Sequence, residues 1–471
     1  MNTVGLRMRL AVPPEAAALL DAQSRIHGWW HNHLVERVNA IRSQRDDQTV
    51  RQLLYSPYGL RNLLTEAKQT QPFLRSCWTY SLQAVAIRMT ATVKKTRTAP
   101  RSPAPWAGWP RFHRWSTDWA ALEYHALTGG FTLANRTLKL TFGREEDGSQ
   151  IHCSVSLVER LPPYARPSAL TPAVKATHPI RGLRIIREHG VYYAVFIVRR
   201  ELAAVKPLPT TPRVISLDPH HYSLAVAVDT DGMATRIPYP PGVRPLGRRI
   251  DQLKARRDTC VRAWVTDERG IRRAVSSKRW KEFDALIQQT QRRREARITQ
   301  YLYEVANWLC RHYEVIAIGD YRPGQATHAV SAVNRWVHNE SLVGRLRQTV
   351  AWVAQRSGRR YLTWPEEGTT RTCHYCGNKW IDGIPTGRRY YYCPGCGHHW
   401  RRNECSASNG LRLALLQINS PLSDSGRLEI GSRRTYRSTG LVVTAGAGAG
   451  ADSFARPIGN QTSLVRETDP R

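Results

Sequence analysis

The chain has 471 residues, and its 70 Lys and Arg against 37 Asp and Glu give a formal net charge of +33. Positive charge spread through most of a sequence excludes one solvated basic face as its explanation and favours nucleic acid as the partner. The nine cysteines show no disulfide pattern, and neither a signal peptide nor a run of eighteen apolar residues is found. We therefore expect a soluble protein of the prokaryotic cytoplasm, with no membrane partner.

The first 210 residues predict a β-barrel interrupted by helices. Residues 4–12 alternate apolar and basic side chains, which is typical of a strand, and Pro13 and Pro14 then open a helix. A second helical stripe over 78–89 precedes a basic, proline-rich loop at 94–110. Short alternating segments between 131 and 198 predict five more strands. We expect an oligonucleotide-binding-type barrel and a helical insert, with these bounds: barrel 1–12 and 125–210, insert 13–124.

The pattern changes at Arg213 to that of an α/β domain. Residues 214–218 form a buried strand that ends in an acid, and 314–318 form a second one that ends in Gly319-Asp320. We expect the first part of this domain at 211–365 and its last helix at 401–420. Ser, Gly, Thr and Arg dominate 421–471, a composition that predicts disorder.

Two Cys-x-x-Cys motifs lie between these parts of the domain. They read Cys373-His-Tyr-Cys376 and Cys393-Pro-Gly-Cys396, and each is followed by a glycine. Four thiolates at this spacing can close a tetrahedral site, and the glycines allow the tight turn that such a motif needs. The sequence therefore predicts a structural Zn²⁺ site in a zinc ribbon over 366–400.

Six short motifs occur in a fixed order, at 108–112, 184–193, 215–218, 315–320, 368–377 and 392–398. The ordered set resembles the TnpB nucleases of insertion sequences and the compact type V CRISPR effectors, over roughly residues 4–415. The resemblance implies a multidomain α+β protein. In that family the barrel corresponds to a wedge-like domain, and the helical insert corresponds to a recognition domain. The α/β domain becomes an RNase H-like, RuvC-type domain with an inserted zinc ribbon.

In that family three acids hold two divalent metal ions for phosphodiester hydrolysis, because several carboxylates are needed to offset the charge of the ions. Asp218 occupies the first acidic position here. Gly319 and Asn403 stand at the second and third, where neither side chain carries a charge. We therefore expect a weak Mg²⁺ site at most, and a nuclease-deficient, RNA-guided DNA-binding protein.

Three alternatives stay open. An active Mg²⁺-dependent nuclease would use Asp218 together with Asp320 and Glu404, which lie one residue beyond the two degenerate positions. A one-residue shift on a strand turns the Asp320 side chain to the opposite face, whereas Glu404, at the start of a helix, is less constrained. The second alternative is a DNA-targeting subunit that recruits transposition proteins or another effector, and the third is a zinc-ribbon DNA-binding protein that needs no guide. Asp218 could also persist only as a hydrogen-bonded acid at the end of a strand.

The resemblance implies guide RNA and target double-stranded DNA as partners. Tight binding without cleavage would then silence invading DNA, as in antiviral defence, or repress transcription of a host gene. The resemblance also implies that the first 210 residues recognise a short flanking motif on the DNA. The arginine-rich stretch 244–297 would line the channel that holds the nucleic acid. The candidate contact residues are Arg7, Arg9, Lys94, Lys95, Arg97, Arg111, His113, Arg114 and Trp115 in the first region, and Arg256, Arg257, Arg292, Arg293 and Arg294 in the second.

Overall fold

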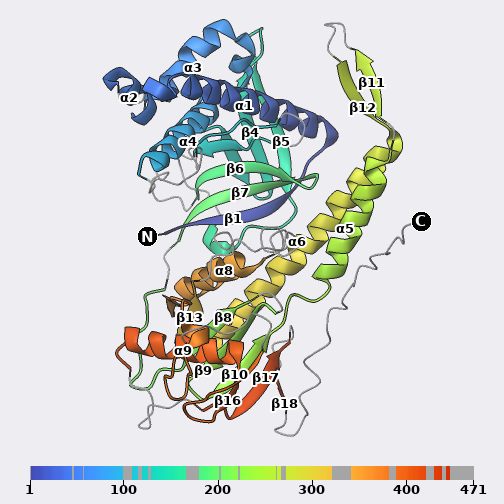
Figure 1. Cartoon of the computed structure of the whole chain (residues 1–471). Coiled ribbons are helices and arrows are strands. Elements are labelled where there is room, and N and C mark those ends of the chain that lie inside the picture. Colours follow the sequence, from blue (N-terminus) through green and yellow to red (C-terminus); the bar gives the residue numbers. More distant parts are fainter. Residues whose placement is uncertain are drawn as a thin grey trace, which may run out of the picture. The chain divides into compact units, whose positions relative to one another are not determined.

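The computed structural model divides the chain into two compact units, Met1–Glu201 and Leu202–Arg471 (Figure 1). Each unit is described by itself. The structure describes residues 2–44, 47–56, 58–98, 109–114, 119–125, 129–165, 180–200, 203–220, 223–260, 262–266, 272–320, 341–380, 389–420, 429–437 and 442–445. None of the described helices combines the length and the apolar run that a membrane crossing requires.

The first unit contains a seven-stranded antiparallel sheet in the order β2-β6-β7-β1-β5-β4-β3. Its strands are β1 (Asn2–Ala11), β2 (Leu122–His125), β3 (Phe131–Ala134), β4 (Thr137–Arg144), β5 (Gln150–Leu157), β6 (Ile180–Glu188) and β7 (Val191–Arg200). The long strand β1 pairs with β7 up to Arg9 and with β5 from Leu10, so it joins the two halves of the sheet. Because side chains alternate along a strand, Met8 and Leu10 enter the core while Arg7 and Arg9 are exposed.

Four helices follow β1 in this unit: α1 (Pro14–Ala40), α2 (Gln48–Tyr55), α3 (Gly59–Thr70) and α4 (Thr79–Thr98). Their apolar faces form a separate core around Trp30, Leu60 and Leu82. Trp109, from the segment after α4, completes this core. The strand β2 lies within the range predicted for the helical insert, so that part of the prediction is wrong, because β2 pairs with β6 of the sheet.

The second unit contains a mixed seven-stranded sheet in the order β14-β13-β8-β9-β10-β17-β18. Its strands are β8 (Val214–Pro219), β9 (Ala225–Asp229), β10 (Met233–Ile237), β13 (Val315–Gly319), β14 (Arg360–Trp364), β17 (Ser432–Tyr436) and β18 (Val442–Ala445). The strands β8, β13 and β14 run parallel, whereas β8, β9 and β10 form an antiparallel meander.

Helices cover both faces of this sheet. The helices are α5 (Val243–Asp258), α6 (Lys278–His312), α8 (Val343–Arg356) and α9 (Arg402–Gln417). Ile215 and Ile316 pack with residues of α6 and α8 on one face. Val214 and Ala317, one residue out of phase, pack with α9 on the other. The α9 face is therefore the one that Asp218 and Gly319 share by strand alternation.

The predicted disorder of residues 421–471 is wrong for two short segments. The strand β17 pairs in parallel with β10, and β18 pairs with β17, so both extend the sheet. Arg434 of β17 donates to Asp229 at 3.3 Å and to the Tyr313 hydroxyl at 2.6 Å, and Tyr436 is fully buried. Composition alone could not predict these strands, because their polar side chains and backbone groups are hydrogen-bonded to residues far away in the sequence. The remainder of the predicted tail, apart from 429–437 and 442–445, lies outside the described residues.

Two small hairpins complete the second unit. The first, β11 (Arg262–Thr266) with β12 (Arg272–Ser276), lies at the far end of the antiparallel helices α5 and α6 (Figure 1). The second, β15 (Tyr390–Tyr392) with β16 (His399–Arg401), carries the second cysteine motif between its strands.

Candidate functional site

The four cysteines of the paired motifs lie together. All four sulfur atoms are within 4.8 Å of one another, with 3.8 Å between Cys373 Sγ and Cys396 Sγ and 3.5 Å between Cys376 Sγ and Cys393 Sγ. A tetrahedron with Zn–S bonds of about 2.3 Å has S–S edges of about 3.8 Å. The donor set and its dimensions therefore fit a single tetrahedral metal ion.

Backbone turns hold each motif in this arrangement. The Gly377 amide donates to the Cys373 carbonyl at 2.9 Å, and the Gly397 amide donates to the Cys393 carbonyl at 2.8 Å. Both glycines have positive φ, 78° and 69°, a conformation that other residues adopt only with strain. The two motifs thus form the same local turn, as their sequences indicate.

Asp218 lies at the end of β8, buried on the face that α9 covers. Its Oδ1 accepts a hydrogen bond from Ser406 Oγ of α9 at 3.1 Å, and Ser406 Oγ is 3.0 Å from Thr369 Oγ1. Burial raises the pKa of the Asp218 carboxyl to about 7, although the Ser406 hydrogen bond and the charge of Arg402 oppose this shift. Asp218 is therefore held by α9 in a site that disfavours its charged form relative to a carboxyl in water.

Gly319 ends the neighbouring strand β13, one step beyond the paired residues Ile318 and Leu217. A Cβ atom at position 319 would lie 2.7 Å from both Cγ and Cδ of Glu366. The Glu366 side chain, from the segment after β14, thus fills the space that a side chain on residue 319 would need. Sequence reasoning missed Glu366; the signal that could have found it is an acid two residues beyond Trp364, which pairs with Gly319.

Asp320, one of the two candidate replacement acids, is exposed. Its amide donates to the Trp364 carbonyl at 3.0 Å, and its Oδ1 accepts from the Glu366 amide at 3.2 Å. This carboxylate therefore fixes the backbone of the segment after β14.

Glu404, the other candidate, is buried in the first turn of α9 and paired with Arg433 of β17. Arg433 donates from Nε to Oε1 and from Nη2 to Oε2, both at 3.0 Å. This two-pronged pairing is the strongest geometry available to a carboxylate and a guanidinium. Asn403, the residue before Glu404, is half-buried and contributes only a neutral amide. The carboxylate nearest the third degenerate position is thus already neutralised within the protein.

The four cysteines are the single group of three or more metal-ligating side chains within the described ranges. Asp218, Asp320, Glu366 and Glu404 form no such group there. A two-metal site for phosphodiester hydrolysis needs several convergent carboxylates, so the residues that the structure describes do not fit the pair of Mg²⁺ ions of that chemistry.

Most candidate nucleic-acid contacts with described side chains are exposed: Arg7, Arg9, Lys94, Lys95, Arg111, Arg114, Arg256 and Arg293. Several candidates also have partners within the protein. Arg7 pairs with Glu188 and covers the Tyr193 ring, and Arg257 pairs with both Asp258 and Asp284. Arg257 is half-buried, as are His113, Arg292 and Arg294, and Arg294 also pairs with Glu295. The Arg97 side chain and Trp115 lie outside the described part.

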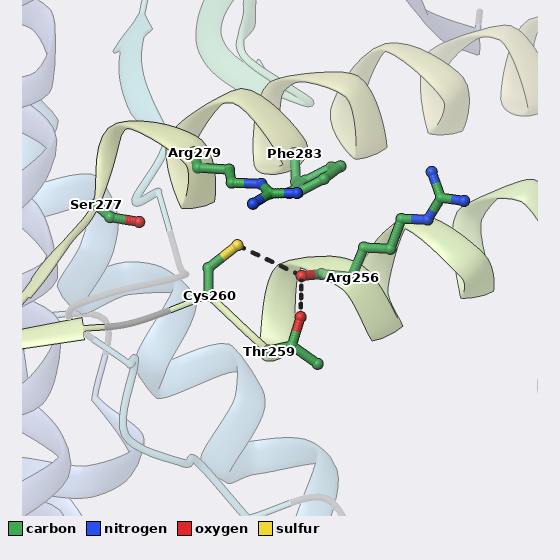
Figure 2. Close-up of a pocket in the computed structure, with 6 residues that line it drawn as sticks. All are labelled: Arg256, Thr259, Cys260, Ser277, Arg279 and Phe283. Atoms are coloured by element: carbon green, nitrogen blue, oxygen red, sulfur yellow. Dashed lines mark hydrogen bonds between the residues drawn. The ribbon is translucent and has the colours of Figure 1, made fainter.

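A cavity of about 450 Å³ opens where α5 ends and α6 begins, and Figure 2 shows its lining of Arg256, Thr259, Cys260, Ser277, Arg279 and Phe283. The Arg256 carbonyl accepts from Thr259 Oγ1 and Cys260 Sγ, while its guanidinium points away from both (Figure 2). The Arg279 guanidinium lies 5.9 Å from the centre of the Phe283 ring. Neither arginine forms an ion pair with a carboxylate of the described chain. Two uncompensated cations beside an aromatic ring are suited to a nucleotide.

Three solved structures illustrate what the whole chain is similar to. A Cas12f1–sgRNA–target DNA complex has a TM-score of 0.45 and 11% identity, covering 87% of this chain and 98% of that one. CasPhi-2 (Cas12j) bound to crRNA has a TM-score of 0.35 and 10% identity, with 88% and 98% covered. C2c1 of Alicyclobacillus acidoterrestris with single-guide RNA has a TM-score of 0.34 and 10% identity, with 85% and 69% covered. TM-scores below 0.5 are too low to carry a functional inference.

A search of the curated proteins found no match to the sequence. A family model does match: residues 344–409 fit the family described as Cas12f1-like, TNB domain. This range begins in α8, contains β14 and all four cysteines, and ends in α9 beside Asp218. The expected similarity to the compact type V CRISPR effectors is therefore confirmed at residues 344–409, which match the Cas12f1-like, TNB domain model.

Proposed function

We propose that this chain is an RNA-guided DNA-binding protein with a degenerate RuvC-type nuclease site, which binds target DNA without cutting it. The observation that carries the proposal is the pairing of Glu404 with Arg433 beside Asn403. This pairing occupies the carboxylate nearest the third acidic position, so that carboxylate is not available to a metal ion. Gly319 supplies no side chain at the second acidic position. Asp218 is then the one acid in place among the three that this chemistry requires.

The proposed domain assignment follows from the topology. In the second unit, an antiparallel meander β8-β9-β10 continues through parallel β13 and β14, with helices on both faces. This supports an RNase H-like fold. We assign the antiparallel sheet of the first unit to an oligonucleotide-binding-type wedge barrel, and α1 to α4 to the recognition insert.

We assign the four-cysteine cluster to a structural Zn²⁺ ion held by Cys373, Cys376, Cys393 and Cys396. When bound, the ion would cross-link the two motifs and leave no open position for catalysis. Asn409 of α9 donates to the carbonyls of Thr369 and Thr372, both at 2.8 Å, so the segment that enters the ribbon is tied to the helix beside Asp218. The ribbon is thereby fixed to the degenerate site.

The proposed partners are guide RNA and target double-stranded DNA, in the prokaryotic cytoplasm. The net charge of +33 and the Cas12f1-like TNB domain support them. Base pairing with the guide would select the sequence, and the bound complex would block transcription or replication. This would silence invading DNA or repress a host gene. Recruitment of transposition proteins by the same DNA-bound complex is the alternative biological role.

The test has two parts. RNA that copurifies with the full-length protein is sequenced, and a plasmid carrying the matched sequence is incubated with the complex and Mg²⁺ or Mn²⁺. We expect one discrete RNA and retarded but intact plasmid. Clean nicking or cutting would overturn the proposed loss of nuclease activity, and the absence of a discrete RNA would overturn guide dependence and favour a zinc-ribbon DNA-binding protein.

A specific observation supports an active nuclease as the second candidate. The Glu366 side chain fills the space beside Gly319, so a carboxylate from the segment after β14 lies near the position that β13 leaves empty. In this case cleavage would depend on Asp218 and Glu366, and not on Asp320 or Glu404. Glu366→Gln would then abolish any cleavage that the wild-type complex shows, whereas Asp320→Asn would not.

A further inference from the structure

The segment 109–114 of the first unit has no regular secondary structure, yet side chains of α1 hold its backbone in place. Asn32 makes a matched pair of hydrogen bonds with the His113 backbone: its Nδ2 donates to the carbonyl at 3.1 Å, and its Oδ1 accepts from the amide at 2.7 Å. His31 Nε2 donates to the Arg111 carbonyl at 3.0 Å. The backbone on either side of residue 112 is therefore held in one conformation.

The start of the segment is anchored in the helical core. Trp109 is buried, its Nε1 donates to Asn39 Oδ1 of α1 at 2.9 Å, and Arg42 covers its ring. Burial lowers the pKa of His31 to about 4, so its ring is neutral and keeps its proton on the nitrogen that donates to Arg111. The anchor and the two clamps all come from α1 or the turn that follows it.

This rigid segment presents an aromatic ring to solvent. Phe112 is 56% exposed, although its neighbour Trp109 is buried. Arg111 and Arg114 on either side are also exposed, and Arg111 forms no ion pair with any carboxylate of the described chain. Phe112 has no polar atom to hydrate, so a partner that covers its exposed ring would gain free energy by removing apolar surface from water.

The arginines on either side of Phe112 favour a polyanion such as nucleic acid as the partner. The aromatic ring between them is suited to contact the bases of that nucleic acid. A segment held in place loses little conformational freedom when its ring stacks on a base. Separation of stacked base pairs makes a further demand on rigidity, because the wedge must not yield as it enters the step. The double clamp by Asn32 and His31 therefore favours a DNA duplex over a single strand as the occupant.

We propose that Phe112 is a wedge that enters a base step of the target duplex at the point where the strands separate, with Arg111 on the adjoining phosphate. The inference rests on the proposed RNA-guided binding of DNA, and it assigns strand opening to a residue outside the predicted contact set. It predicts that Phe112 acts on duplex targets and contributes little to the binding of RNA.

The experiment uses the full-length protein with its copurified guide and a matched duplex that carries 2-aminopurine at successive positions beside the guide-paired segment. Wild type is compared with Phe112→Ala, Phe112→Trp and Asn32→Ala, and with Tyr58→Ala as a control that removes another ring of similar exposure, 57%. The same proteins are titrated with a target whose strands are already separated by a mismatched bubble. Thermal unfolding is recorded for each variant.

In wild type we expect a rise in 2-aminopurine fluorescence at one position. Phe112→Ala should lose this rise and bind the duplex roughly five- to 150-fold more weakly, the range of one aromatic–base contact. Phe112→Trp should retain the fluorescence rise and the duplex affinity, whereas Asn32→Ala should weaken both of them. Tyr58→Ala should change neither the fluorescence nor the affinity. The bubble target should bind Phe112→Ala almost as tightly as wild type.

Equal duplex affinity and fluorescence in wild type and Phe112→Ala would overturn the wedge. So would an equal loss of affinity for the duplex and the bubble, since that would indicate simple stacking, and a loss of guide RNA from Phe112→Ala, which would place the ring on RNA. If wild type itself fails to bind the matched duplex, the proposed RNA-guided function fails, independently of Phe112.

Discussion

Arg433 and Glu404 lie 29 residues apart in the sequence and meet through two 3.0 Å hydrogen bonds at the start of α9. The Glu404 side chain is almost fully buried, whereas Arg433 is 40% exposed. A guanidinium therefore compensates the negative charge that a divalent ion would meet at this carboxylate. Arg433 also belongs to β17, so the charge of α9 and the outer strands of the sheet depend on each other.

Arg433→Ala should lower the free energy of unfolding by about 3 kcal/mol, because it leaves the buried Glu404 carboxylate with only Arg401, whose Nη1 lies 3.7 Å from Oε1. Urea unfolding measures the loss. Arg437→Ala, which removes an exposed arginine just beyond β17, should cost less than about 0.5 kcal/mol. Addition of Glu404→Gln to Arg433→Ala should recover part of the loss, and equal stabilities of the two arginine variants would contradict the pairing.

Cys376→Ser should remove the bound metal, because three thiolates and a hydroxyl no longer provide the four-sulfur tetrahedron. We expect about one zinc per chain in wild type and a large loss in the variant, measured by atomic absorption after gel filtration. Cys260→Ser is the control, since that thiol lies in the α5–α6 cavity and is not part of the cluster. Full retention of zinc by Cys376→Ser would show that the cluster is not the site.

Asp218→Asn should stabilise the protein above pH 7 and have little effect near pH 4. In the folded chain the Asp218 carboxyl keeps its proton up to about pH 7, whereas its ordinary pKa is 3.8. Between these values the folded state binds more protons than the unfolded state, so this group lowers the free energy of unfolding as the pH rises. The full cost above pH 7 is on the order of 4 kcal/mol. Urea unfolding from pH 4 to 8 tests this, and parallel curves for the two proteins would rule it out.

Gly319→Ala should destabilise the second unit by about 1–3 kcal/mol, since the new methyl group would lie against Cγ and Cδ of Glu366. The same substitution in a Glu366→Ala background should cost much less. A double-mutant cycle of urea unfolding yields the coupling energy directly. Gly344→Ala is a suitable control, because a Cβ at that glycine meets nothing within 4 Å. A coupling energy near zero would mean that Glu366 does not occupy the space.

Arg256→Ala should weaken nucleic-acid binding, whereas Arg257→Ala should mainly lower the thermal stability of the protein. Arg256 is exposed and forms no ion pair in the described chain, so its loss should weaken nucleic-acid binding and reduce the slope of log K against log salt by about one. Arg257 pairs with Asp258 and Asp284 and covers the Trp280 ring, so its loss should act mainly on thermal stability. Binding titrations at several salt concentrations and melting curves distinguish the two. A reversed assignment would show that the ion pairs of Arg257 do not persist in solution.

Short-range patterns were the part of this protein that the sequence could predict. The cysteine cluster follows from two local motifs, and Asp218 follows from a buried strand that ends in an acid. Glu366 and Arg433 could not be found in this way, because they reach their positions through the β13–β14 pairing and the β10–β17 pairing. Phe112 belongs to the motif at 108–112 but was not predicted as a contact residue, because the backbone beside it is held by Asn32 and His31, which lie about 80 residues earlier in the sequence.

The parallel pairing of β17 with β10 also limits how far this protein can be shortened for practical use. A version that stopped at residue 420 would keep every cysteine and every acid discussed above. It would nevertheless expose the unpaired backbone of β10, a site for intermolecular aggregation, and would leave the buried Glu404 carboxylate of α9 with only the 3.7 Å contact to Arg401. Engineered miniature forms should therefore retain the chain through at least Ala445.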